Sequence, residues 1–133
     1  ACARAGFPRV TGVEVSSGAI SSAISAARHA GLSRSAASFI ADDATSWARA
    51  QSAADVPDVI VVNPPRRGIG ADLAAYLNEC DAPRVIYSSC NPASLAKDLA
   101  AMPTLRPVEG RLFDMFPHTT HAEVALLLER ASA

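Results

Sequence analysis

Strands alternate with helices along this 133-residue chain, and this alternation limits its fold more than any other feature. The clearest strand is expected over Asp58–Val62, where a run of β-branched apolar residues precedes Asn63-Pro64-Pro65. The two prolines prevent the strand from continuing, because proline cannot donate a ladder hydrogen bond. Strands that alternate with helices predict an α/β fold with a mainly parallel sheet.

The same periodicity predicts the other elements. Ser16 or Ser17 can cap the first helix and Gly31 can end it, while Pro92 suits the first turn of the last helix. Helices are expected from Ser16 or Ser17 to Ala30 and over Ala44–Ala53, Ala71–Cys80 and Pro92–Ala101. Further strands are expected over Val10–Val15, Ala37–Ala41, Arg84–Tyr87, Leu105–Leu112 and His121–Glu129.

Polar and reactive side chains follow several of these strands. In parallel α/β sheets, ligands bind beyond the carboxyl ends of the strands. This rule selects Glu14, Asp42 or Asp43, Asn63-Pro64-Pro65-Arg66 and Ser88-Ser89-Cys90-Asn91 as candidate site residues.

The start of the chain does not contain the Gly-x-Gly-x-x-Gly turn with which a nucleotide site of this kind normally begins. We therefore expect residues 1–133 to be a partial domain that lacks its first strand. That strand would pair between Val10–Val15 and Asp58–Val62. Because unpaired buried backbone is costly, we expect a second chain, by self-association, or a rearranged sheet to cover those edges.

Composition excludes several classes of protein. The formal net charge of −1 argues against a stand-alone nucleic-acid binder, and an apolar content of 50% argues against a disordered segment. No apolar run reaches the roughly 20 residues of a membrane span, and no signal-peptide core is present, so we expect a cytoplasmic protein. Three cysteines form neither a disulfide framework nor a CxxC metal site.

Two candidate segments permit more than one interpretation. Glu14 could accept hydrogen bonds from ribose hydroxyls or be a solvated acid. The loop Asn63-Pro64-Pro65-Arg66 could grip a planar group or be an ordinary turn. Arg66 stands where amino-methylating enzymes carry an aromatic residue, which argues against that class. Arg66 and Arg67 could hold phosphates or form a solvated pair.

Cys90 lies between a buried strand and a helix N-terminus, where the helix dipole stabilises a thiolate. It could equally be a small buried apolar residue. Cys2 and Cys80 are interpreted as structural.

The segment Pro117–Glu123 combines two histidines with a carboxylate. The spacing of His118, His121 and Glu123 fits no standard zinc motif, so no metal is expected. Glu123 is a candidate general base, and a polar turn is the alternative.

Three of these motifs together resemble one family. Asn63–Gly68, Tyr87–Pro92 and Phe113–Glu123 are similar to the signatures of the RNA (uracil-5-)-methyltransferases, and the asparagine of the first motif is most similar to the 23S ribosomal RNA branch. The resemblance extends over nearly all of the chain from Val10 onward. It implies a Rossmann-like, S-adenosylmethionine-dependent methyltransferase fold whose last strand is antiparallel.

The resemblance also implies functional roles. S-adenosylmethionine would be the methyl donor, and a uridine in ribosomal RNA would be the acceptor. Cys90 would be the nucleophile that forms a covalent adduct with uracil, and Glu123 would be the base. Glu14 would bind the ribose of the donor, Asn63 would lie in the donor site, and Asp43 is a candidate for the adenine edge. An iron–sulfur cluster would belong only to an N-terminal part outside this chain.

Two alternatives stay open. An RNA cytosine-5 methyltransferase would carry a second cysteine in the loop that here reads Asn63-Pro64-Pro65-Arg66, and none is present. A truncated, folded domain without catalytic activity is the other alternative.

Overall fold

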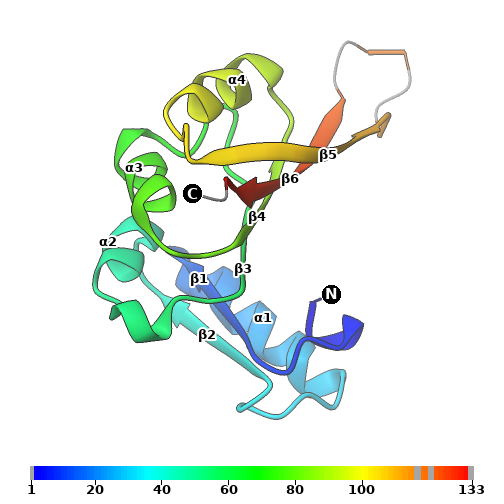
Figure 1. Cartoon of the computed structure of the whole chain (residues 1–133). Coiled ribbons are helices and arrows are strands. Elements are labelled where there is room, and N and C mark those ends of the chain that lie inside the picture. Colours follow the sequence, from blue (N-terminus) through cyan, green and yellow to red (C-terminus); the bar gives the residue numbers. More distant parts are fainter. Residues whose placement is uncertain (1, 116–117, 120–121, 132–133) are drawn as a thin grey trace. The chain divides into compact units, whose positions relative to one another are not determined.

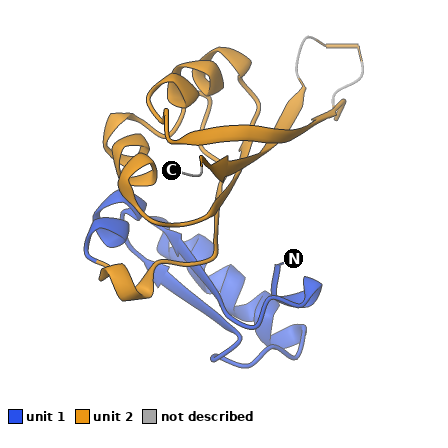
Figure 2. Cartoon of the chain, in the orientation of Figure 1, with its two compact units in different colours: residues 1–50 blue, residues 51–133 orange. Residues whose placement is uncertain are grey.

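A computed structural model of the chain describes residues 2–115, 118–119 and 122–131. The chain divides into two compact units, Ala1–Ala50 and Gln51–Ala133, which Figure 2 shows in different colours.

Unit 1 contains a parallel pair of strands joined by a helical crossover. Val10 pairs with Ala37 at the start of the two strands and Glu14 pairs with Ala41 at their end. The connecting helix begins after Ser16, whose hydroxyl accepts a hydrogen bond from the Ala19 amide at 3.3 Å. The elements of unit 1 are η1 (Cys2–Ala5), β1 (Val10–Glu14), α1 (Ser17–His29), β2 (Ala37–Ala41) and α2 (Ala44–Arg49).

Unit 2 contains a four-stranded sheet in the order β3-β4-β6-β5. β3 and β4 pair in parallel, whereas β6 pairs antiparallel with both β4 and β5. Its elements are η2 (Ala53–Asp55), β3 (Val59–Val62), α3 (Ala71–Glu79), β4 (Arg84–Ser89), α4 (Pro92–Ala100), β5 (Leu105–Phe113) and β6 (Glu123–Arg130). In Figure 1, β5 and β6 run together as a two-stranded ribbon. The antiparallel last strand is thus confirmed.

The core of unit 2 lies between its sheet and the helices α3 and α4. Burial alternates along β4, so that Val85, Tyr87 and Ser89 face this core. The side chains at the intervening positions, Ile86 and Ser88, point to the other face of the sheet because successive strand residues alternate. The most deeply buried large side chains are Tyr87, Leu77, Met102, Leu128 and Val85.

Several element boundaries differ from the sequence expectations. The helix expected over Ala44–Ala53 ends at Arg49, and a short 3-10 turn follows at Ala53–Asp55. The strand expected over Arg84–Tyr87 continues to Ser89, because β6 supplies pairing partners as far as Val124. The last strand begins at Glu123, while the expected start at His121 lies outside the described residues.

β1 is an edge strand of the sheet in unit 1, and β3 is an edge strand of the sheet in unit 2. These are the two strands with which the expected further strand would pair. Within the described residues, β1 pairs with β2 alone and β3 pairs with β4 alone. What covers these edges, including a second copy of the chain, stays a prediction. In the part of the chain that is described, no helix combines the length and the apolar character of a membrane span.

Candidate active site

The carboxyl ends of β3 and β4 carry two of the predicted motifs. Val62 and Tyr87 are the last pair in register between these parallel strands, and β4 continues to Ser89, so the loop after β3 begins two residues before the turn that follows β4. The loop after β3 starts with Asn63, which is exposed, and β4 is followed directly by Cys90. This is the edge at which α/β sheets bind ligands.

Cys90 is half-buried in a turn that is held on both sides. The Asn91 amide donates to the Ser89 hydroxyl at 3.0 Å, and this hydroxyl donates to the Asn91 carbonyl at 3.1 Å. The side-chain oxygen of Asn91 accepts from the Ala93 amide at 3.1 Å and caps α4. The thiol is therefore carried at the start of a capped helix, as the sequence predicted.

Glu123 is the first residue of β6, beside the end of β4. Ser89 pairs with Val124 in the last register position, so Cys90 and Glu123 each lie one residue beyond that pair. The Ser88 hydroxyl donates a hydrogen bond of 2.5 Å to Oε1 of Glu123. Strand pairing thus brings the predicted base to the segment that carries the predicted nucleophile.

The loop after β3 is attached to the same region. The side-chain amide of Asn91 donates to the Arg66 carbonyl at 2.8 Å. Since Asn91 follows Cys90 directly, the Asn63-Pro64-Pro65-Arg66 motif and the cysteine turn are connected by a hydrogen bond. The three motifs of the resemblance therefore meet within unit 2.

Sequence reasoning missed Asp98, a buried acid on α4 that is 5% exposed. Its Oδ2 accepts hydrogen bonds from the Tyr87 hydroxyl at 2.5 Å and from the Ile69 amide at 2.9 Å. Burial, and secondarily the neighbouring Asp98 carboxylate, raise the pKa of Tyr87 well above its ordinary value. A signal was available, because Asp98 interrupts the apolar stripe of Leu95, Leu99 and Met102 at helical spacing.

The predicted donor ligands of unit 1 are exposed and hydrogen-bonded locally. Oε1 of Glu14 accepts from the Ser16 amide at 2.9 Å. Oδ1 of Asp43 accepts from the Ser46 amide at 2.8 Å and caps α2, and this bond lowers the pKa of Asp43. Asp43 thus has a structural role in the fold, and its role at an adenine edge stays a prediction.

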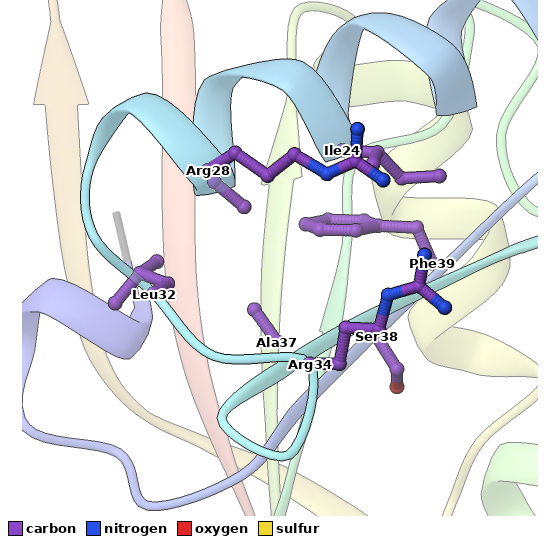
Figure 3. Close-up of a pocket in the computed structure, with 8 residues that line it drawn as sticks. Ile24, Arg28, Leu32, Arg34, Ala37, Ser38 and Phe39 are labelled. Atoms are coloured by element: carbon purple, nitrogen blue, oxygen red, sulfur yellow. The ribbon is translucent and has the colours of Figure 1, made fainter.

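Unit 1 also contains a hollow between α1 and the start of β2, with a volume of about 260 Å³. Phe39 lies beneath Ile24, with Arg28 and Arg34 nearby (Figure 3). The hollow contains none of the predicted site residues; the two that belong to unit 1, Glu14 and Asp43, lie at or just after the carboxyl ends of β1 and β2. Its lining residues are Ile24, Ala27, Arg28, Leu32, Arg34, Ala37, Ser38 and Phe39.

The described residues contain no group of three or more histidine, cysteine or acidic side chains that could hold a metal ion. His118 is exposed and has a backbone φ of 68°. His121, the other histidine of this segment, lies outside the described residues.

The family model described as tRNA (Uracil-5-)-methyltransferase matches residues 54–131, which include all three motifs. The chain belongs to this family. The resemblance inferred from the motifs is therefore confirmed.

Curated relatives of this methyltransferase family share about half of their aligned residues with the chain. The 23S rRNA (uracil(747)-C(5))-methyltransferase RlmC of Edwardsiella ictaluri is 49% identical over 93% of the chain and 32% of its own length. RlmC of Shewanella amazonensis is 48% identical over 99% of the chain and 34% of its own length. The chain thus spans about a third of the length of these relatives.

Solved structures support the family fold. The Pyrococcus abyssi tRNA (uracil-54, C5)-methyltransferase, in complex with S-adenosyl-L-homocysteine, is 31% identical with a TM-score of 0.79, over 95% of this chain and 30% of that one. TrmN from Thermus thermophilus is 22% identical with a TM-score of 0.65, over 92% of this chain and 36% of that one. The predicted Rossmann-like methyltransferase fold is confirmed.

Proposed function

We propose that the protein transfers a methyl group from S-adenosylmethionine to carbon 5 of a uridine in ribosomal RNA. Family membership supports the reaction class, and the 23S rRNA relatives support the kind of RNA. The S-adenosyl-L-homocysteine in the Pyrococcus abyssi structure supports the donor.

The observation that carries this proposal is the hydrogen bond between Ser88 and Glu123. It brings a carboxylate to the strand end that is followed by Cys90, so an acid and a thiol occupy one edge of the sheet. Methylation of uracil at carbon 5 requires these two groups, one to activate the ring and one to remove its proton.

Carbon 5 of uracil is a poor nucleophile until the ring is activated. The Cys90 thiolate adds to carbon 6, and the electron pair of the ring double bond moves to carbon 5 and the neighbouring carbonyl as an enolate. Carbon 5 then takes the methyl group that the donor supplies from its sulfonium, which becomes a thioether. The methylated ring remains bonded to Cys90 at this stage.

Glu123 completes the reaction by removing the proton from carbon 5. The double bond between carbons 5 and 6 forms again, and the Cys90 sulfur leaves as a thiolate. The Ser88 hydroxyl donates a hydrogen bond to Oε1 of Glu123 and orients this side chain for the step. The uridine must be unpaired or flipped out of its stack to reach the thiol.

Two of the predicted donor contacts are each exposed at the carboxyl end of a strand. Glu14 is exposed at the carboxyl end of β1, where a carboxylate can accept hydrogen bonds from ribose hydroxyls. Asn63 is exposed at the end of β3 and offers an amide to the donor. Asp43 is the third predicted contact, at the adenine edge of the donor. The cytoplasmic location of the protein also stays a prediction.

A specific observation separates this proposal from an RNA cytosine-5 methyltransferase. The loop between β3 and α3, residues 63–70, contains no cysteine, whereas that class would carry one there. The other alternative, a folded domain without catalytic activity, is separated from the proposal by experiment.

The test measures transfer of a labelled methyl group from S-adenosylmethionine to 23S rRNA by the purified protein. Cys90→Ala is expected to reduce transfer to background, whereas Cys80→Ala is the matched control because Cys80 is also half-buried and lies at the end of α3. Full activity of Cys90→Ala would exclude the covalent mechanism. A folded wild-type protein that neither binds the donor in calorimetry nor methylates RNA would support the non-catalytic alternative.

A further inference from the structure

The buried carboxylate of Asp98 connects three segments of unit 2. Asp98 lies on α4, its Oδ2 accepts from the Tyr87 hydroxyl of β4, and the same atom accepts from the Ile69 amide in the loop after β3. Two donors converge on one oxygen, whose two lone pairs can accept both hydrogen bonds. The contact with Ile69 joins residues that are 29 positions apart in the sequence.

Gly68 shows how closely the loop approaches this carboxylate. Gly68 is buried and has a backbone φ of 89°, a conformation that residues with a side chain rarely adopt. A Cβ atom at this position would collide with the carboxylate oxygens of Asp98. The loop therefore passes directly against Asp98, and the contact requires glycine at position 68.

A second hydrogen bond holds the same loop from the residue after Cys90. The Asn91 side chain donates to the Arg66 carbonyl at 2.8 Å while it also caps α4. The loop is thus attached at Arg66 and at Ile69, in both cases to residues on or at the start of α4. Two attachments fix both the position and the direction of a loop, whereas one would leave it free to pivot.

An acid at position 98 is not the residue that would give the highest stability. Burying a charged group carries a desolvation penalty that apolar residues avoid, and replacing buried ionic groups by apolar ones is often neutral or stabilising. Leu95, three positions earlier in α4, belongs to the buried core, so position 98 adjoins that core. A requirement to hold the loop accounts for a hydrogen-bond acceptor at this position.

We propose that Asp98 is a positioning residue, which acts through the Ile69 amide to hold the Asn63-Pro64-Pro65-Arg66 loop at a fixed place relative to Cys90. This inference rests on the proposed function, because it assigns the loop and the thiol to one reaction. Asp98 is itself buried, and it reaches the loop through the Ile69 amide. Its loss is expected to lower kcat more than it changes the KM for RNA, since phosphate contacts dominate affinity for nucleic acids.

The test compares variants of the purified protein by kcat, KM and amide hydrogen exchange. Asp98→Ala removes the acceptor, and we expect kcat to fall at least about tenfold, because displacements of about 1 Å are enough to cost that much. The Ile69 amide is expected to exchange at least about tenfold faster. Asp98→Asn keeps an oxygen for Ile69 and should retain kcat within about threefold of the wild type.

Two control variants change hydrogen bonds of unit 2 and leave both contacts of the loop in place. Tyr87→Phe removes the other donor to Asp98 and leaves the Ile69 contact. Thr104→Val removes the hydrogen bonds of the Thr104 hydroxyl with Asn78 and Arg130. These hydrogen bonds do not involve the loop of residues 63–70. Both are expected to keep kcat of the folded protein within about twofold, and a merely structural role of Asp98 would make Asp98→Ala behave like them.

Gly68→Ala approaches the same contact from the loop side and replaces Asp98→Ala if that variant does not fold. It should lower kcat and speed exchange at Ile69 in the same way, because it displaces the loop while Asp98 is intact. If these variants show faster exchange at Ile69 with unchanged kcat, or no change in exchange at Ile69, the positioning role of Asp98 is overturned. The proposed function is unaffected by either result. A wild-type protein without methyl transfer would overturn the proposed function and this inference with it.

Discussion

Unit 2 contains two polar networks, one at each end of β4, and they differ in what they hold in place. At the start of β4, the Arg130 network joins the ends of α3 and β6 to the segments before β4 and β5. Arg130 donates to the carbonyls of Leu77, Asn78 and Ala82 and to the Thr104 hydroxyl, at 2.9–3.2 Å. At the other end of β4, the site network comprises Ser88, Ser89, Asn91, Asp98 and Glu123.

Both networks satisfy their buried groups, since no buried side-chain nitrogen or oxygen among the described residues lacks a hydrogen-bond partner. The presence of hydrogen-bond partners therefore does not distinguish a functional network from a structural one in this protein. The acceptors of the Arg130 network are mainly backbone carbonyls, whereas the site network includes the Glu123 carboxylate at the start of β6 and surrounds the Cys90 thiol in sequence. Reactive groups at the ligand-binding edge identify the candidate site.

Glu123→Gln is expected to have the largest effect among the variants that test this difference. Loss of a general base typically costs about 10²–10⁴-fold in rate, and here it should act after methyl transfer. The methylated RNA should then remain attached to Cys90 as an adduct that survives a denaturing gel. Glu129→Gln is the matched control, because Glu129 lies on the same face of β6 and pairs with Arg84 at 3.2 Å.

Normal turnover of Glu123→Gln without an adduct would show that another group removes the proton. An equal loss of rate in Glu129→Gln would show that charge on this face of β6, rather than a base at position 123, matters.

Arg130→Met should affect stability rather than catalysis. Removing the guanidinium leaves the carbonyls of Leu77 and Asn78 without this donor, and the free energy of unfolding is expected to fall by about 2–3 kcal/mol. Urea denaturation measures this change. The kcat of the folded fraction should be unchanged, and a lower kcat would mean that the two networks are coupled.

Ser88→Ala tests the site network at its hydrogen bond to the carboxylate. The variant keeps Glu123 and removes the donor to Oε1, so we expect kcat to fall about tenfold, equivalent to roughly 1.4 kcal/mol. Ser94→Ala is a control, since its hydroxyl donates to the Asn91 carbonyl and does not contact Glu123. Equal kcat values for Ser88→Ala and the wild type would exclude an orienting role for Ser88.

The sequence was sufficient to predict features that depend on short segments. The strand Ala37–Ala41 has the predicted bounds, and Pro92 begins a helix as expected. Cys90 lies at the predicted junction of strand and helix for the same reason, because a buried run and a cap are local signals. The family resemblance rests on three such motifs.

Contacts between distant segments could not be predicted in the same way. The bond between Ser88 and Glu123 joins residues 35 positions apart and depends on the register of β4 against β6. A shift of one residue would turn Glu123 to the other face of the sheet. The Asp98 contact with Ile69 likewise depends on how α4 packs, although the acid within an apolar stripe gave a local signal that something polar must face it.

Tyr87→Phe should have the smallest effect and gives a pH-dependent difference. The pKa of Tyr87 is raised by burial and by Asp98, so the folded protein keeps this proton at pH values where the unfolded chain has lost it. The contribution of Tyr87 is complete below the ordinary tyrosine pKa of about 10 and is lost as the pH rises above it. Phenylalanine has no such proton, so the free energy of unfolding of the variant should fall less steeply above about pH 10.

Below that pH the variant should be less stable by only about 1 kcal/mol, the usual net value of one hydrogen bond. Urea denaturation between pH 7 and 10.5 measures both effects. Tyr76→Phe is the control, because burial also raises the pKa of Tyr76, yet the described bonds of Asp98 do not involve it. If the free energy of unfolding of Tyr87→Phe falls as steeply above about pH 10 as that of the wild type, the buried pair of Tyr87 and Asp98 does not cause this loss of stability. If kcat is unchanged in the same variant, then of the two hydrogen bonds of Asp98 only the one with the Ile69 amide affects catalysis.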